Sequence, residues 1–275
     1  MQRSRDRFLT THTGSLPRPD DLIRMMYAKE EGVPVDPDAL AARVKAAVAE
    51  VVKKQADAGI DLINDGEMSK PSYATYIKDR LEGFGGTGNT FVYQDLSDFP
   101  RLEKRVFGDP GRSRRKTPAC NAPISVRDRN APQVDADNLK AALKEVKAVG
   151  GFMSAASPGV VSLFFRNDHY KDFETYIYAI ADAMRHEYET VTKAGFVLQI
   201  DCPDLGMGRH IQYADLSVPS SASARSCISR RSIMRWPISR LSNCACISAG
   251  GTTKAHIIAM SRSPTSSTSF SRPSR

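Results

Sequence analysis

Residues 173–201 read FETYIYAIADAMRHEYETVTKAGFVLQID, and they give the clearest indication of the fold class. Its apolar and aromatic residues recur at helical spacing along one face: Phe173, Tyr176, Ile177, Ile180, Met184, Tyr188 and Val191. The stripe predicts an amphipathic helix over 173–194, which Gly195 ends. The next run, 196–200, predicts a short buried strand that ends at Asp201. A buried strand that follows an amphipathic helix is typical of an α/β protein with a parallel sheet.

The same alternation occurs upstream. Strands are predicted at 8–15, 60–63, 119–126 and 152–155. Helices are predicted to follow Asp36-Pro37, to span 73–81, and to run through Leu139 and Leu143. Together with the stretch at 173–201, the pattern amounts to about five strand–helix units.

Polar residues stand just past several of the predicted strands. Ser15 follows the first strand, Asp65 and Glu67 follow the second, and Asp201 ends the last. In (β/α)₈ barrels the active site is assembled at the carboxyl ends of the strands. An open doubly wound sheet also places ligands there, so it remains the alternative to a TIM barrel that is incomplete in this chain.

The net charge of +8 over 275 residues belongs to one end of the chain. Residues 219–275 contain nine Lys and Arg and no Asp or Glu, which leaves 30 basic and 31 acidic residues in 1–218. The main body is therefore not predicted to bind nucleic acid. No apolar run reaches the roughly 18–20 residues that cross a bilayer, and the start of the chain lacks an apolar signal region. We expect a cytoplasmic protein with no membrane partner.

Three motifs in order carry a family resemblance: TTHTGSLPRP at 10–19, DGE at 65–67 and QIDCP at 199–203. Intervening stretches agree, among them APIS at 122–125 and GFMSAASPG at 151–159. Over residues 8–218 the chain resembles the catalytic barrel of cobalamin-independent methionine synthase, in its short single-barrel bacterial relatives. The resemblance implies a (β/α)₈ barrel that transfers a methyl group from 5-methyltetrahydrofolate to homocysteine, with zinc as the cofactor that binds the homocysteine sulfur.

The resemblance also implies site residues. Glu67 and Asp201 match the acids that bind the amine of homocysteine, and Thr13, Gly14 and Ser15 match a small turn that binds its carboxylate. Cys202 stands where the family has Glu. Zinc coordination would convert the homocysteine thiol to a thiolate, the form that attacks a methyl group.

Other roles for these residues stay open. Asp65 is expected to cap a following helix, and Asp201 could do the same. The loop 112–116 (RSRRK) is expected to be solvated, or else to meet the polyglutamate of folate. A related zinc-dependent thiol alkyltransferase of the epoxyalkane–coenzyme M type is the second enzyme hypothesis, although two acids favour an amino-acid thiol. A non-catalytic truncated barrel with a tail that binds anionic partners is the third.

The composition changes abruptly after residue 218. A reading offset by one base permits segments that the family shows beyond its QIDCPDL strand, such as HICW at 246–250. We therefore hypothesise a frame slip near Val218–Pro219, with a partial barrel at 1–218 and a disordered, Ser-rich tail at 219–275. The family's zinc ligands lie beyond this point, and the spacing of Cys244, Cys246 and His256 matches no zinc pattern. The chain as written is expected to have no metal ligands and no activity.

Overall fold

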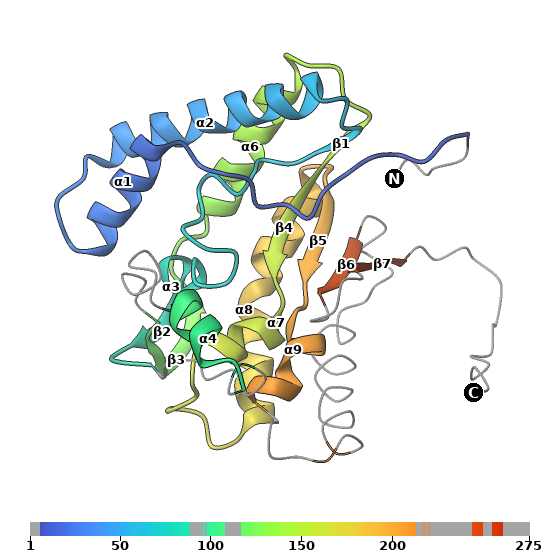
Figure 1. Ribbon diagram of the computed structural model, residues 1–275. Coiled ribbons are helices and arrows are strands. Elements are labelled where there is room, and N and C mark those ends of the chain that lie inside the picture. Colours follow the sequence, from blue (N-terminus) through green and yellow to red (C-terminus); the bar gives the residue numbers. More distant parts are fainter. Residues whose placement is uncertain are drawn as a thin grey trace, which may run out of the picture.

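The computed structural model describes residues 6–88, 96, 98–107, 117–212, 217, 220, 244–249 and 255–260 (Figure 1). The loop 112–116 and the boundary at 218–219 lie outside these residues.

The main sheet has the strand order β1-β4-β5-β6-β7 within the described part of the chain. Its strands are β1 (Leu62–Ile63), β4 (Gly150–Ala156), β5 (Val197–Asp201), β6 (Cys244–Ala249) and β7 (Ala255–Met260). Neighbours are parallel from β1 to β6, and β7 is antiparallel to β6. The pairing of β4 with β5 sets Ser154 opposite Gln199 and Ala156 opposite Asp201. An α/β fold with a parallel sheet is thus confirmed, while closure into eight strands stays a prediction.

Two predicted strands differ from the prediction: one belongs to a separate sheet, and the other is not a strand. The segment 119–126 is a strand, β3 (Ala119–Val126), but it pairs antiparallel with β2 (Leu81–Gly85) in a separate two-stranded sheet. The prediction of a strand at 8–15 is wrong. The Thr10 amide donates to the Asp61 carboxylate at 2.7 Å, so a side chain takes the bond that a strand ladder would need. The nearby carbonyl of Thr10 still accepts one bond, from the Leu62 amide at 3.0 Å.

The long helices follow the sequence closely. Helix α2 (Pro37–Asp57) begins at Asp36, whose carboxylate accepts from the Asp38 amide at 3.0 Å. Helix α8 (Phe173–Lys193) carries the predicted apolar stripe. The predicted helix over 73–81 is shorter, α3 (Ile77–Arg80), because Leu81 leaves it to pair in β2. The other helices are α1 (Asp20–Glu30), α4 (Pro100–Phe107), α6 (Ala131–Leu143), α7 (Pro158–Phe164) and α9 (Asp204–Ile211).

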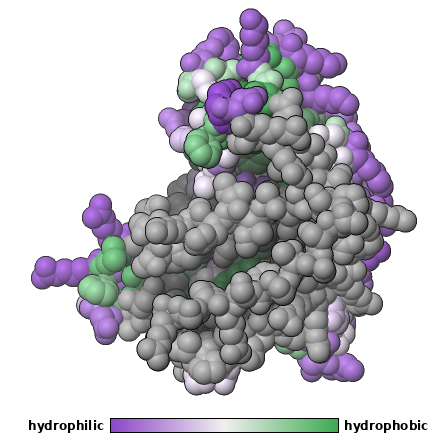
Figure 2. All heavy atoms as spheres, turned by 90° about the vertical axis from the view of Figure 1, so that its right-hand side faces the viewer, coloured by the Kyte–Doolittle hydropathy of each residue, from purple (hydrophilic) through white to green (hydrophobic). Residues whose placement is uncertain are grey.

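The core lies between the helices and the sheet. Helix α2 packs on α6, α6 packs on α8, and α8 packs on β4 and β5 (Figure 1). Val52 of α2, Leu139 of α6 and Ile180 of α8 are fully buried there. In the upper part of Figure 2, hydrophilic residues lie along the outer margin and hydrophobic residues lie between them, as expected for amphipathic helices.

Strands β6 and β7 lie within 219–275, the segment for which the sequence predicts disorder. Both are short runs containing Ile and Ala, CACISA and AHIIAM, and they extend the sheet beyond β5. The structure therefore gives two parts of this segment regular secondary structure that the sequence analysis did not expect.

Candidate functional site

A tight turn after β1 presents Glu67. The Asp65 carboxylate accepts from the Glu67 amide at 2.9 Å, and the Asn64 side chain accepts from the Gly66 amide at 2.5 Å. Glu67 has φ +58°, the one positive φ of a non-glycine residue within the described ranges. Its side chain is 1% exposed. The turn thus carries a buried carboxylate on a strained backbone.

The carboxylate of Glu67 faces Gly14. A Cβ atom at Gly14 would lie 3.1 Å from Glu67 Oε1 and 2.4 Å from Ser154 Oγ, so only glycine fits at this position. The other oxygen, Glu67 Oε2, is buried and has no hydrogen-bond partner among the described residues. An unsatisfied buried carboxylate oxygen is costly, and a bound cation would satisfy it.

Asp201, at the end of β5, lies close to Glu67, Gly14 and Ser154. Gln199 joins them: its Nε2 donates to Asp201 Oδ1 at 2.8 Å, to Ser154 Oγ at 3.2 Å and to the Thr13 carbonyl at 2.7 Å. Burial, and after it the negative charge of Glu67, raise the pKa of Asp201 to about 7, although the hydrogen bond from Gln199 and the charge of Lys70 lower it. Two carboxyl groups that repel each other in a buried place are suited to sharing a positive ligand.

The segment 13–15 completes the arrangement. Gly14 is buried, with φ +123°, whereas Thr13 and Ser15 are exposed. The Leu16 amide donates to the Gly66 carbonyl at 3.2 Å and fastens this segment to the turn that carries Glu67. The structure therefore brings Gly14 and the Thr13 carbonyl close to the groups around Glu67 and Asp201, whereas Ser15 is exposed beside them.

The comparisons with known proteins agree with these motifs. A family model described as cobalamin-independent synthase, catalytic domain, matches residues 8–230. The chain belongs to this family.

Individual relatives are more distant. A methionine synthase from Sulfolobus acidocaldarius is 25% identical over 195 residues, which is 70% of this chain and 51% of the relative. A B12-independent methionine synthase from Shewanella sp. W3-18-1, solved in complex with selenomethionine, has a TM-score of 0.58 at 19% identity and aligns over 86% of this chain and 59% of its own. A putative vitamin-B12-independent methionine synthase from Listeria monocytogenes has a TM-score of 0.58 at 16% identity, over 87% and 64%. The chain thus spans about half the length of the curated relative it matches.

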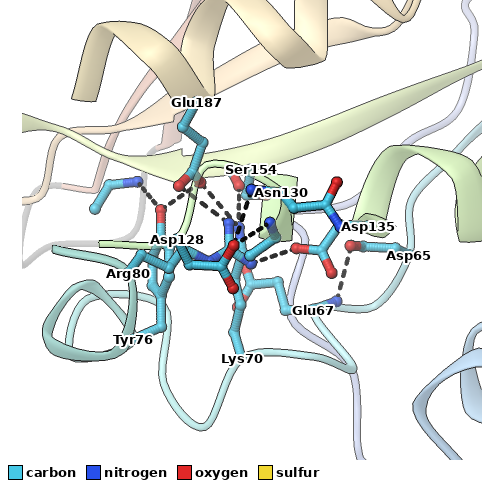
Figure 3. A network of polar contacts seen from close by, with 12 residues as sticks. Asp65, Glu67, Lys70, Tyr76, Arg80, Asp128, Asn130, Asp135, Ser154 and Glu187 are labelled. Carbon is cyan, nitrogen blue, oxygen red and sulfur yellow. Dashed lines mark hydrogen bonds and ion pairs between the residues drawn. The ribbon is translucent and has the colours of Figure 1, made fainter. Parts of the chain in front are cut away.

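A buried ionic network lies behind the site of this cobalamin-independent synthase homologue (Figure 3). Lys70 Nζ donates to the Ser154 carbonyl and lies 3.8 Å from Glu187 Oε1. Arg80 lies 3.0 Å from the other Glu187 oxygen and also pairs with Asp135. Burial opposes ionisation of Glu187, but Arg80 and Lys70 outweigh it and lower its pKa. The backbone of Ser154, whose hydroxyl faces Gly14, is therefore held by Lys70, which is itself paired with Glu187.

The sequence analysis missed these supporting residues. Ser154 and Gln199 stand inside quoted motifs without an assigned role. Glu187 lies at helical spacing from Met184 and Val191, in the buried stripe of α8, and a charge on an apolar stripe is the signal that could have indicated a buried partner.

The capping roles considered for the two aspartates are not supported. Asp65 holds the turn at Glu67 rather than the start of a helix, and burial raises its pKa to about 6. Helix α9 begins after Pro203 without a side-chain cap bond, so Asp201 does not cap it.

The described residues do not fit a zinc site. Within them, no group of three His, Cys, Asp or Glu side chains could hold a metal ion. Backbone register places Cys244 beside Leu198 and Cys246 beside Ile200, whereas Ala245 falls beside Gln199. The donor set at the site is two carboxylates, not the thiolates and imidazoles that zinc prefers.

Two cavities, of about 340 and 550 Å³, lie elsewhere, between α2 and the segment around Pro71. Ser69 and Pro71 line both, and neither is lined by Glu67 or Asp201. We place the candidate site at the carboxylate pair, since the polar groups from the three motifs converge there.

No helix in the described part of the chain is long and apolar enough to span a bilayer.

Proposed function

We propose that the site binds the amino-acid end of homocysteine, for methyl transfer from 5-methyltetrahydrofolate to its thiol. Glu67 and Asp201 bind the ammonium group, and the turn at Thr13, Gly14 and Ser15 receives the carboxylate. The observation that carries the proposal is the buried, unpartnered Glu67 Oε2 next to a second carboxyl group. The selenomethionine held by the Shewanella relative is an amino acid of the same class.

The proposed reaction needs orientation more than binding strength. The sulfur forms a bond to the methyl carbon while the bond from that carbon to the folate nitrogen breaks, and the nitrogen keeps the electron pair and takes up a proton. Fixing the ammonium of homocysteine at Glu67 and Asp201 sets the direction in which its sulfur points. The family resemblance implies that zinc, where it is bound, would supply the thiolate form of the homocysteine sulfur.

We further propose that the chain as written binds the amino acid without turning it over. The resemblance puts the metal ligands of the family beyond residue 218, in the segment that the frame-slip hypothesis replaces. Sequencing the DNA around codons 215–222 tests the slip directly. We also propose a cytoplasmic location, with homocysteine and 5-methyltetrahydrofolate as partners and with neither a nucleic acid nor a membrane among them.

Calorimetric titration of the 275-residue chain with L-methionine, the stable product, tests the binding proposal. Glu67→Gln and Asp201→Asn are each expected to weaken binding by roughly tenfold or more, since a hydrogen bond to a charged group contributes about 1.5–3 kcal/mol. Glu145→Gln removes an exposed carboxylate and serves as the control. Equal affinity in all three variants would rule the proposal out.

The coenzyme M hypothesis is tested in the same experiment. A sulfonate thiol carries no ammonium, and two carboxylates would repel its anionic end. Coenzyme M should therefore fail to compete with L-methionine. Competition at similar concentration, unaffected by Glu67→Gln, would favour the alkyltransferase alternative.

A further inference from the structure

We propose that Arg18 is a positioning residue that holds Glu67 where its carboxylate faces Asp201 and the ammonium group of the substrate. The inference rests on the proposed function, which assigns that ammonium to Glu67. Arg18 belongs to the motif TTHTGSLPRP, in which residues 13–15 have a suggested role and Arg18 has none.

Arg18 binds the turn from outside. Its Nη2 donates to the Glu67 carbonyl at 2.7 Å and also to the Lys70 carbonyl. The Lys70 amide in turn donates to the Glu67 carbonyl at 3.0 Å. One guanidinium nitrogen therefore joins both ends of the turn 67–70.

The turn needs such a restraint. Gly66 has φ +67° and Glu67 has φ +58°, so two successive residues are left-handed and the second carries a side chain. A non-glycine residue keeps this conformation only where its surroundings fix it. The Asp65 carboxylate holds the Glu67 amide, and Arg18 holds the carbonyl on the other side of the same residue.

The arrangement leaves the chemistry of Glu67 free. Both of these Arg18 bonds go to main-chain carbonyls, so they fix where the side chain begins without using its carboxylate oxygens. Glu67 Oε1 then lies against Gly14, and Oε2 has no hydrogen-bond partner in the described ranges. Without Arg18, Glu67 can relax toward negative φ, and its carboxylate then turns away from Asp201.

The test uses the full chain with Arg18→Ala, Arg18→Gln and Arg18→Lys. Arg24→Ala is the matched control, because Arg24 is an exposed arginine on the neighbouring helix α1. Circular dichroism first confirms that each variant is folded. We expect Arg18→Ala to lose roughly tenfold or more in affinity for L-methionine, Arg18→Lys to recover part of it, and Arg24→Ala to match the unaltered chain.

A second readout separates positioning from general stability. The Asp201 carboxyl group is titrated by carbon NMR, with Asp201→Asn for assignment. Its neighbours are Glu67, which raises its pKa, and Lys70 and Gln199, which lower it. In folded Arg18→Ala, the Asp201 midpoint should fall in the same direction as in Glu67→Gln, since the Glu67 charge has moved away. Loss of an arginine that did not position Glu67 would not lower this midpoint, because removing a positive charge can only raise the pKa of a carboxyl group.

The outcomes can be distinguished. Unchanged affinity and an unchanged Asp201 midpoint in the folded Arg18 variants would overturn the proposal. If Arg18→Ala does not fold, Arg18→Gln and Arg18→Lys decide in the same way. If Glu67→Gln binds L-methionine as the unaltered chain does, the proposed function is wrong. The titration midpoint of Asp201 in the Arg18 variants then still tests whether Arg18 positions Glu67.

Discussion

Burial, and after it the negative charge of Glu67, raise the pKa of Asp201, although Asp201 ends β5 and Glu67 follows β1, two strands that are not neighbours in the sheet. Strand β4 lies between β1 and β5, and its Ser154 hydroxyl is close to both Gly14 and Gln199. A pair of like charges in this position costs stability in the ligand-free protein. A bound cation would remove the repulsion between the two carboxylates, so ligand binding and stability should both depend on their charges.

The affinity for an α-amino acid should depend on pH. Only ionised Asp201 attracts the ammonium group, and its pKa is about 7 without ligand. Affinity for L-methionine should therefore be low below about pH 6, rise as pH increases and level off near pH 8, where the ligand still carries its ammonium. Calorimetry across this range measures it, and Asp201→Asn should flatten the curve. An identical pH dependence in Asp201→Asn would contradict the assignment.

Ligand-free stability should rise when the same charge is removed. The folded pKa of Asp201 is raised above the unfolded value of 3.8, so this group lowers stability progressively as pH increases from about 4 to 7. At pH 8, Asp201→Asn should thus increase the melting temperature, by roughly 2–4 °C for each kcal/mol recovered. At about pH 4 the difference should disappear. A variant that melts lower at pH 8 would show that the carboxylate stabilises the fold instead.

Gly14→Ala should disrupt the site because the new methyl group would clash with Ser154 and Glu67. The new methyl group would lie 2.4 Å from Ser154 Oγ and 3.1 Å from Glu67 Oε1, at a φ of +123°. Gly32→Ala is the control, since Gly32 also has a positive φ, +78°, but nothing lies within 4 Å of its Cβ position. Both variants should lose about 1 kcal/mol or more from backbone strain, and only Gly14→Ala should also lose L-methionine binding. Retained affinity in Gly14→Ala would place the ligand elsewhere.

The buried ion pairs of Glu187 should contribute more to the free energy of unfolding than an exposed ion pair does. Glu187→Gln leaves Arg80 and Lys70 buried with less negative charge, and removing one partner of a buried pair typically costs about 3–5 kcal/mol. Lys53→Met breaks an exposed pair with Asp57 and should cost no more than about 1 kcal/mol. Urea unfolding of both variants gives the comparison. Similar losses would mean that the network does not anchor β4.

Local pattern was enough to predict the long elements, and side-chain contacts account for what it missed. Helices α2 and α8 and strand β5 follow from an N-cap, an apolar stripe and a glycine stop, all of them near in sequence. The segment 8–15 has strand-like composition, but the Asp61 carboxylate takes the Thr10 amide, and no local rule foresees a partner so distant in the chain. Arg18 and Gln199 were missed for the same reason, since each acts through a bond to a remote turn.

We expect the chain as written to lack the zinc that the family resemblance implies. Because the frame-slip hypothesis replaces the segment beyond residue 218 that would carry the family's metal ligands, the purified 275-residue chain should contain far less than one zinc per chain by elemental analysis. It should also transfer no methyl group from 5-methyltetrahydrofolate to homocysteine. A version restored to the offset frame beyond residue 218 should bind zinc and gain this activity, whereas Glu67→Gln in that version should keep the zinc and lose activity, because Glu67 binds the amino acid rather than the metal. Stoichiometric zinc in the unrepaired chain would refute the frame-slip explanation for its missing ligands.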